Sequence, residues 1–172
     1  MPQHSWQRAV YAALKAAHIT QLAYVPDAGH AHLITAAQAD PNMRDVVLTT
    51  EEEGIALAAG AWLGGQRAVL LMQSSGVGNC INMLSLPVNC RMPFLTLVTM
   101  RGEWGEFNPW QVPMGAATPH VLAAAGVHVH RADRPDEAAD TVAAAAALAF
   151  DSAVSVAVLL GQRLIGTKVF VE

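Results

Sequence analysis

Hydrophobic and polar residues follow two repeating patterns that alternate along the whole chain. Short apolar runs, bounded by proline, glycine or polar residues, predict six β-strands. These strands are expected at residues 19–25, 45–49, 68–73, 94–99, 127–130 and 154–160. Between them, apolar positions at helical spacing predict helices. The helices are expected at residues 5–18, 31–39, 51–63, 117–125 and 135–150, with one more that follows a glycine-rich turn at 76–79 and ends near residue 86.

Strands that are separated by helices need crossover connections, which are right-handed and place helices on both faces of a sheet. The fold class is therefore expected to be α/β, a three-layer α/β/α arrangement with a six-stranded, mostly parallel sheet. Residues 1–172 are expected to form a single domain. In such sheets, ligands bind beyond the carboxyl ends of the strands. Four loops at that edge are polar or rich in glycine: residues 26–30, 50–53, 74–79 and 101–106.

The composition excludes several classes of protein. Of 172 residues, 53% are hydrophobic and 14% are charged, which excludes a disordered chain. A net charge of −4 argues against nucleic acid or an anionic membrane surface as a partner. The longest apolar run, residues 141–150, is far shorter than the roughly 20 residues of a membrane span, and the first residues do not resemble a secretory signal, so a cytoplasmic location is expected. A chain with so few charges is also expected to cover part of its surface with another subunit.

Histidines occur twice in the H-x-H spacing, which places both rings on one face of a strand. The two pairs are His30 with His32 and His128 with His130. Protein zinc sites take three or four ligands, and no cysteine or third histidine lies near either pair in the sequence. We therefore predict no metal ligands in this chain.

Three consecutive acids, Glu51, Glu52 and Glu53, open the helix expected at 51–63. Acids at a helix amino terminus interact favourably with the helix dipole, by about 0.3–1 kcal/mol each, and this role alone can explain one or two of them. The helix continues with small residues at 54–61, which allow close packing against another element or subunit. A glutamate at the lip of such a contact is partly desolvated and suited to proton transfer. Both roles stay open at this point.

The segment Gly76-Val77-Gly78 follows a strand, as phosphate-binding glycine loops do. Two phosphate-binding motifs are excluded, because Ile81 stands where a dinucleotide fingerprint needs glycine or alanine and no Gly-Lys-Ser/Thr of a Walker A loop is present. The serines at 74 and 75 also lack the preceding glycine of a hydrolase elbow. What remains is a turn at which a ligand or another backbone can come close.

Arg101 follows the strand expected at 94–99. A guanidinium in this place can be solvated or paired locally. It can also recognise an anionic group, because its planar fork makes two parallel hydrogen bonds to an oxyanion.

Several segments resemble the pyrimidine-binding domain of thiamine diphosphate enzymes, and in particular that of the sulfopyruvate and phosphonopyruvate decarboxylases. The segments are residues 23–27, 51–60, 72–84, 100–106 and 158–166. They stand in the order that the family has, and the resemblance extends over nearly the whole chain. It implies a subunit of a thiamine diphosphate-dependent 2-oxo acid decarboxylase, in which the cofactor carries the organic chemistry.

The resemblance also implies roles for individual residues. Counting back nine residues from Gly60 gives Glu51 as the acid that hydrogen-bonds the aminopyrimidine ring of the cofactor and exchanges a proton with it. The two-histidine motifs of some decarboxylases are replaced here by residues 101–106, which suits a substrate with an anionic tail, a sulfonate or a phosphonate. The residues expected beside the organic part of the cofactor are Ser75, Gly76, Val77, Gly78 and Asn79. The candidate substrate-binding residues are Asp27, His30 and Arg101.

The Gly-Asp-Gly motif with which the family binds the diphosphate is absent from the sequence. The resemblance therefore implies that a second subunit holds the diphosphate and ligates Mg²⁺, and that the active site forms between chains. Homodimerisation is also expected, and the substrate would be a small anionic 2-oxo acid. Two alternatives stay open: a carboligase or lyase subunit that uses the same cofactor, and a non-catalytic homodimer of such domains.

Overall fold

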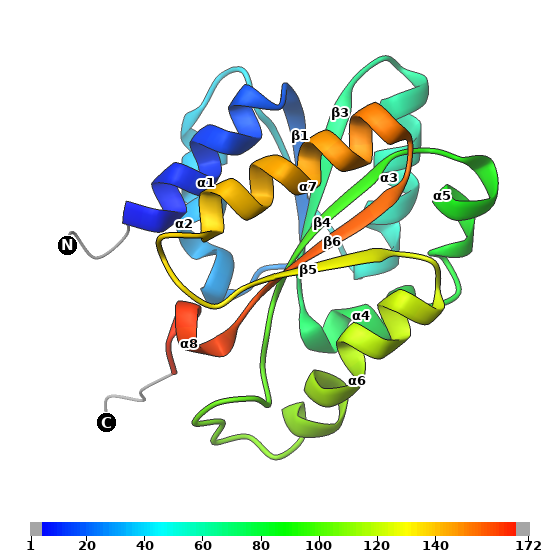
Figure 1. Cartoon of the computed structure of the whole chain (residues 1–172). Helices are drawn as coiled ribbons and strands as arrows, with labels where there is room; N and C mark the ends of the chain where they lie inside the picture. Colours follow the sequence, from blue (N-terminus) through cyan, green and yellow to red (C-terminus); the bar gives the residue numbers. More distant parts are fainter. Residues whose placement is uncertain (1–4, 168–172) are drawn as a thin grey trace.

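A computed structural model describes residues 5–167, and a six-stranded sheet runs through its centre (Figure 1). The strand order is β2-β1-β3-β4-β6-β5, and every neighbouring pair is parallel. The strands are β1 (Ile19–Tyr24), β2 (Arg44–Val47), β3 (Arg67–Gln73), β4 (Phe94–Thr99), β5 (His128–Ala132) and β6 (Ser155–Leu160). The predicted number of strands and their parallel arrangement are confirmed.

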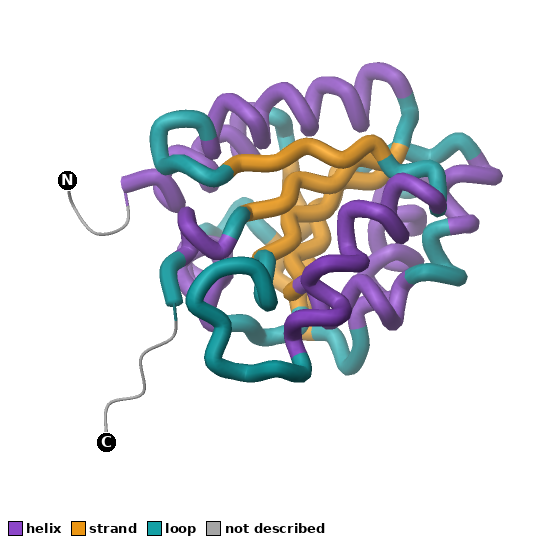
Figure 2. The backbone as a smooth tube through the Cα atoms, turned by 60° about the horizontal axis from the view of Figure 1, so that its bottom comes forward, coloured by secondary structure: helices purple, strands orange, loops and turns teal. Residues whose placement is uncertain are grey.

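Helices cover both faces of the sheet, so the predicted three layers are also confirmed (Figure 2). One face carries α1 (Ser5–Ala16), α2 (Ala31–Ala39) and α7 (Ala138–Ser152). The other face carries α3 (Glu51–Leu63), α4 (Ser74–Cys80), α5 (Ser85–Cys90) and α6 (Gln111–Ala124). Two short helices, η1 (Ala28–His30) and α8 (Gln162–Ile165), follow β1 and β6.

Strand β3 shows why its sequence is apolar at successive positions. Val69 and Leu71 pack on the face of α1 and α7, whereas Leu70 and Met72 pack on the face of α3 and α6. Successive side chains of a strand point to opposite faces, and all four of these are fully buried. A strand with helices on both sides therefore needs apolar residues in both phases of the alternation.

The structure differs from the prediction around the glycine-rich segment. Helix α4 begins at Ser74, so the glycines lie within a helix and not in a turn before one. The single helix predicted up to residue 86 is wrong, because the chain ends α4 at Cys80 and starts α5 at Ser85. Pro87 explains the new start, since proline is tolerated in the first turn of a helix but not in its interior.

Helix α6 begins six residues earlier than the predicted residue 117, at Gln111. Pro113 lies in its first turn, where proline is tolerated, so this proline does not prevent a helix there; Pro119 lies within both the predicted and the observed helix. The loop between β4 and α6 is correspondingly shorter than predicted.

The carboxyl ends of β1, β2, β3 and β4 lie at one edge of the sheet. Tyr24 of β1 is paired with both Val47 and Leu71, and Gln73 at the end of β3 is paired with Thr99 at the end of β4. The loops that follow these strands therefore meet, together with α4, the start of α6 and α8, at the lower end of the molecule in Figure 1. Within residues 5–167, no helix has the length and apolar character of a membrane span.

Candidate active site

The three acids at the start of α3 have different environments. Glu53 accepts a hydrogen bond from the backbone N–H of Thr49 at 2.9 Å, and Glu52 accepts one from the hydroxyl of Thr50 at 2.6 Å. These two acids therefore satisfy donors at the helix start. Glu51 instead turns inward and is 9% exposed, which separates it from its neighbours as a candidate functional residue.

The carboxylate of Glu51 lies directly against helix α4. Asn79 donates a hydrogen bond from Nδ2 to Oε2 of Glu51 at 2.8 Å. A Cβ atom at Gly76 would overlap the Glu51 carboxylate. Glycine at 76 is therefore required by a close approach, but the group that comes close in this structure is the carboxylate of Glu51 and not a second backbone.

The five residues predicted beside the cofactor differ in their exposure to solvent. Val77 is fully buried in the core with Ile55 and Leu84. Gly76 is also buried, whereas Ser75, Gly78 and Asn79 are exposed. The exposed three are the members of this segment whose side chains or backbone can meet a ligand from outside.

Asp27 is held in place by donors from three elements. Its Oδ2 accepts hydrogen bonds from the backbone N–H of Gly29 at 3.0 Å and from Oγ1 of Thr99 at 2.8 Å. Its Oδ1 accepts one from Nε2 of Gln73 at 2.9 Å. Burial opposes ionisation of Asp27, but these three hydrogen bonds and the electrostatic interaction with the adjacent imidazole of His30 hold its pKa below the usual value. Asp27 is therefore a carboxylate at neutral pH.

Gln73 and Thr99 were not predicted as site residues. Each is the last residue of its strand, and the two are paired in register. A polar residue at the carboxyl end of a buried parallel strand is a signal that could have identified both.

His30 lies behind Asp27 and is fully buried. Its Nε2 is 3.1 Å from the carbonyl oxygen of Met72. Burial lowers the pKa of His30, so the ring is neutral at neutral pH. In this position the imidazole contacts the protein interior, and its predicted part in substrate binding stays a prediction.

Arg101 is 7% exposed and is paired with Glu106 in a bidentate ion pair. Nε of Arg101 donates to Oε2 of Glu106 at 2.7 Å, and Nη2 donates to Oε1 at 2.5 Å. Glu106 also accepts hydrogen bonds from the backbone N–H groups of Gly102 and Asn108 and from Nε2 of Gln162, each at 3.0 Å. The Arg101 guanidinium, with these donors, holds the pKa of Glu106 far below its usual range. Local pairing, one of the two roles left open for Arg101, is therefore present.

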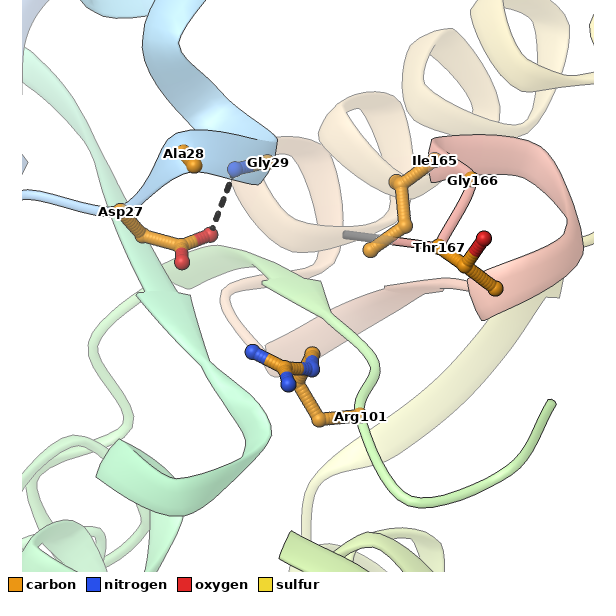
Figure 3. Close-up of a pocket in the computed structure, with 7 residues that line it drawn as sticks. All are labelled: Asp27, Ala28, Gly29, Arg101, Ile165, Gly166 and Thr167. Carbon is orange, nitrogen blue, oxygen red and sulfur yellow. Dashed lines mark hydrogen bonds between the residues drawn. The ribbon is translucent and has the colours of Figure 1, made fainter. Parts of the chain in front are cut away.

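A pocket of about 100 Å³ opens between Asp27 and Arg101 on one side and residues 165–167 on the other (Figure 3). The Arg101 side chain points from the end of β4 towards Asp27 (Figure 3). The structure thus brings together two of the three predicted substrate residues in one pocket, which Glu51 does not line.

A chain of hydrogen bonds connects the predicted cofactor segment with the pocket. Ser75 donates from Oγ to Oε1 of Gln73 at 2.8 Å, and Gln73 in turn donates to Asp27. The backbone N–H of Arg101 donates to Oγ of the buried Ser74 at 3.1 Å. The end of β3 therefore positions both the pocket residues and the start of α4.

Within residues 5–167, no three side chains of histidine, cysteine, aspartate or glutamate come together as a metal site would require. Of the two cysteines, Cys80 is buried beside α3 and Cys90 is exposed. Burial, with the charges of Glu51 and Glu52, raises the pKa of Cys80 to about 12. This thiol is therefore protonated at neutral pH.

Comparison with known proteins identifies close relatives in sequence, although no family model matches the chain. The chain is 37% identical over 153 residues to sulfopyruvate decarboxylase subunit alpha of Methanothermobacter thermautotrophicus, which covers 88% of this chain and 93% of that protein. It is 33% identical over 152 residues to the subunit of the same name from Methanocaldococcus jannaschii, with 88% and 90% covered. Phosphonopyruvate decarboxylase of Streptomyces viridochromogenes is 40% identical over 106 residues, which are 60% of this chain and 27% of that longer protein.

Among solved structures, 2-oxoglutarate:ferredoxin oxidoreductase from Magnetococcus marinus matches 93% of this chain and 29% of its own, with a TM-score of 0.72 and 14% identity. At this identity the likeness concerns the fold alone, and it agrees with the predicted arrangement. The relatives in sequence confirm the predicted class, a decarboxylase subunit. The chain belongs to the family of sulfopyruvate decarboxylase alpha subunits.

Proposed function

We propose that this chain is the alpha subunit of a thiamine diphosphate-dependent decarboxylase that acts on a small anionic 2-oxo acid, 3-sulfopyruvate or its phosphonate analogue. The observation that carries the proposal is the inward-turned carboxylate of Glu51, held against α4 by Asn79 and made possible by Gly76. This arrangement occurs in a chain whose alignment covers 93% of the length of the alpha subunit from M. thermautotrophicus, at 37% identity.

Glu51 has the properties that the aminopyrimidine ring of thiamine diphosphate requires. A carboxylate can accept about four hydrogen bonds, and among residues 5–167 Asn79 supplies the one that reaches Glu51. The carboxylate is nearly buried, so bulk water would compete little with a ring nitrogen placed beside it. Thiamine diphosphate, when bound, supplies the electron sink that the loss of carbon dioxide from a 2-oxo acid needs. Glu51 would hold and return the proton at the ring, and exposed Ser75, Gly78 and Asn79 would border it.

Asp27 and Arg101 are the proposed substrate residues, because both line the pocket at the carboxyl edge of the sheet. Arg101 would recognise the anionic tail. His30 would support Asp27 from behind, since it lies in the interior next to that carboxylate.

We infer a second subunit that holds the diphosphate and Mg²⁺. The described residues contain no cluster of metal ligands, and Mg²⁺ prefers oxygen ligands together with substrate phosphates. The relatives from methanogens are named as alpha subunits, and the matching part of the Streptomyces enzyme is 27% of a longer chain. On this proposal, residues 1–172 are one pyrimidine-binding domain, and the assembled enzyme works in the cytoplasm.

Two copies of the chain are proposed to pair through the outer face of α3. Ala56, Gly60 and Leu63 are exposed there at helical spacing, and Leu63 is 75% exposed. A Cβ atom at Gly60 would meet no atom within 4 Å, so a neighbouring helix can approach closely.

The proposal is tested by reconstitution with the second subunit, Mg²⁺ and thiamine diphosphate. Release of carbon dioxide is measured with 3-sulfopyruvate, 3-phosphonopyruvate and pyruvate. We expect Glu51→Gln to lower kcat by about 10²–10⁴-fold, the usual contribution of a positioned acid or base. Glu52→Gln is the matched control, because Glu52 satisfies a donor at the helix start, and it is expected to retain activity. Full activity of Glu51→Gln would remove Glu51 from this role.

A further inference from the structure

The guanidinium of Arg101 has one occupied edge and one open edge. Arginine carries five N–H donors, arranged so that the Nε/Nη2 edge and the Nη1/Nη2 edge can each grip a carboxylate or similar oxyanion. Glu106 takes the first edge through Nε and Nη2. No hydrogen bond within residues 5–167 involves Nη1 of Arg101, and the side chain lines the pocket (Figure 3). The ion pair with Glu106 therefore leaves a fork that can bind a second oxyanion.

Glu106 holds this fork in one orientation. Side chains of Arg101 and Glu106 are 9% and 4% exposed, so the pair is shielded from water. The backbone is also constrained, because Gly102 has a φ of +78° and a Cβ atom at Gly115 would overlap the carbonyl oxygen of Arg101. A guanidinium fixed in this way loses little conformational entropy when it binds a ligand.

The opposite wall of the pocket is connected to the same carboxylate. Gln162, at the start of α8, is 2% exposed and donates from Nε2 to Glu106. Its Oε1 accepts hydrogen bonds from the backbone N–H groups of Glu103 and Trp104, both at 2.9 Å. Residues 165–167 follow directly and form the wall that faces Arg101. Glu106 is therefore hydrogen-bonded both to Arg101 and to the start of the helix that leads to the opposite wall.

The charges around the pocket limit what can bind there. Arg101 contributes one positive charge, which Glu106 partly offsets, and ionised Asp27 contributes a negative charge to the pocket wall. A singly charged oxyanion can form hydrogen bonds to the open edge of Arg101 and is repelled only weakly by Asp27. A phosphonate can lose a second proton near neutral pH, whereas a sulfonate has no second proton to lose, and the additional negative charge is repelled by Asp27.

We propose that the open edge of Arg101 binds the acidic tail of the substrate, that Glu106 is the positioning residue for this fork, and that Asp27 makes the pocket select a sulfonate over a phosphonate. This inference rests on the proposed function, which it deepens by assigning the tail site. Glu106 acts through Arg101 and does not itself touch the substrate.

The first test compares tailed and tail-less substrates in the reconstituted enzyme. Glu106→Gln and Arg101→Lys are expected to raise KM for 3-sulfopyruvate by about 10–100-fold, the effect of a lost charge-assisted hydrogen bond. For Glu106→Gln, the variant at the positioning residue, kcat/KM for pyruvate is expected to stay within about threefold, since pyruvate has no tail and makes no contact with the fork. Glu103→Gln is the control on the same loop, because Glu103 does not line the pocket, pairs with Arg131 and accepts only a long hydrogen bond, 3.4 Å, from the backbone N–H of Gln162. Equal losses with both substrates would indicate a merely structural role and would overturn the proposal.

The second test measures binding and so does not depend on turnover. The unreactive acids 3-sulfopropionate and 3-phosphonopropionate are titrated into the reconstituted complex by calorimetry. The wild type is expected to prefer the sulfonate, and Asp27→Asn is expected to narrow that preference by about tenfold, because one repulsive charge near the tail is removed. An unchanged preference in Asp27→Asn would contradict the selectivity role of Asp27. If Arg101→Lys bound each acid as tightly as the wild type does, that result would contradict the tail site. If the wild type binds these acids but decarboxylates no 2-oxo acid, the proposed function fails while the tail site stands.

Discussion

Glu51 and Glu106 are both buried carboxylates at the same edge of the sheet, but they differ in how many donors reach them. Five hydrogen bonds converge on Glu106, from Arg101, Gly102, Asn108 and Gln162. One hydrogen bond, from Asn79, reaches Glu51 among the described residues. A carboxylate accepts about four hydrogen bonds, so Glu106 is saturated and Glu51 has room for a ligand. The comparison teaches that burial alone does not distinguish the two carboxylates, whereas unused acceptor capacity does, and this capacity is what the role proposed for Glu51 requires.

Among the substitutions that test this comparison, Gly76→Ala is expected to have the largest effect on activity. The added Cβ atom overlaps the Glu51 carboxylate and must displace it. Activity of the reconstituted enzyme is expected to fall by at least about 100-fold, as for loss of the acid itself. At Gly64, which ends α3 away from the site, a Cβ atom would meet backbone oxygens at an ordinary 3.4 and 3.5 Å. Gly64→Ala is therefore expected to retain at least about tenfold more activity than Gly76→Ala, and equal losses would argue against displacement of Glu51.

Glu106→Gln is expected to lower the stability of the chain more than Glu51→Gln does, which is the opposite of the order expected for activity. Removal of the charge weakens several hydrogen bonds in a shielded site, and the free energy of unfolding should fall by roughly 2–4 kcal/mol. Glu51→Gln should change it by less than about 1 kcal/mol, because one hydrogen bond is affected. Urea unfolding of both variants and the wild type at pH 7 provides the measurement. A larger destabilisation by Glu51→Gln would contradict the comparison.

The same contrast predicts a dependence of stability on pH. The pKa of Glu106 in the folded chain lies far below its usual 4.5. Its contribution is therefore fully present above the unfolded pKa and is lost as the pH falls below about 4.5 towards the folded pKa. Unfolding curves from pH 7 down to pH 3 should show a steeper loss of stability for the wild type than for Glu106→Gln. Parallel curves would show that Glu106 does not carry this pH dependence.

Asn79→Ala tests how much the hydrogen bond from Asn79 contributes to the position of Glu51. The substitution removes the single hydrogen bond to that carboxylate without adding bulk. A loss of kcat of about tenfold is expected, the effect of one hydrogen bond to a charged group. Unchanged activity would indicate that packing against Gly76 alone positions Glu51.

The smallest effect is expected for Glu53→Gln. Glu53 accepts a hydrogen bond from the backbone N–H of Thr49 and lies at the amino terminus of α3. Its loss should reduce the free energy of unfolding by about 0.3–1 kcal/mol through the helix dipole, with activity unchanged. A loss of activity comparable to that of Glu51→Gln would show that the three acids do not have separate roles.

The order of strands and helices was predictable because burial on both faces of a parallel sheet leaves a strong pattern. Both ends of α3 and of β4 coincide with the predicted 51–63 and 94–99. The prediction was wrong where proline rules compete with apolar spacing, at the break between α4 and α5 and in the first turns of α6. There the backbone N–H that proline lacks decides where a helix can start.

The sequence could group Asp27 with Arg101, but it could not show which other residues join or leave their pocket. Asp27 and Arg101 share a pocket that Glu51 does not line. Gln162, which connects Glu106 to the opposite wall, lies 56 residues further along the chain and has no local motif. Its role arises because the loop after β4 and the start of α8 meet at the same edge of the sheet.

By itself, the sequence determined the alternation of strands and helices, and with it the edge where the polar loops gather, because these follow from the period of apolar residues over short stretches. Only the tertiary structure decided which carboxylate is saturated and which keeps free acceptor sites. That difference depends on donors from distant segments, such as Asn79 for Glu51 and Gln162 for Glu106, and their arrival is a property of the folded chain.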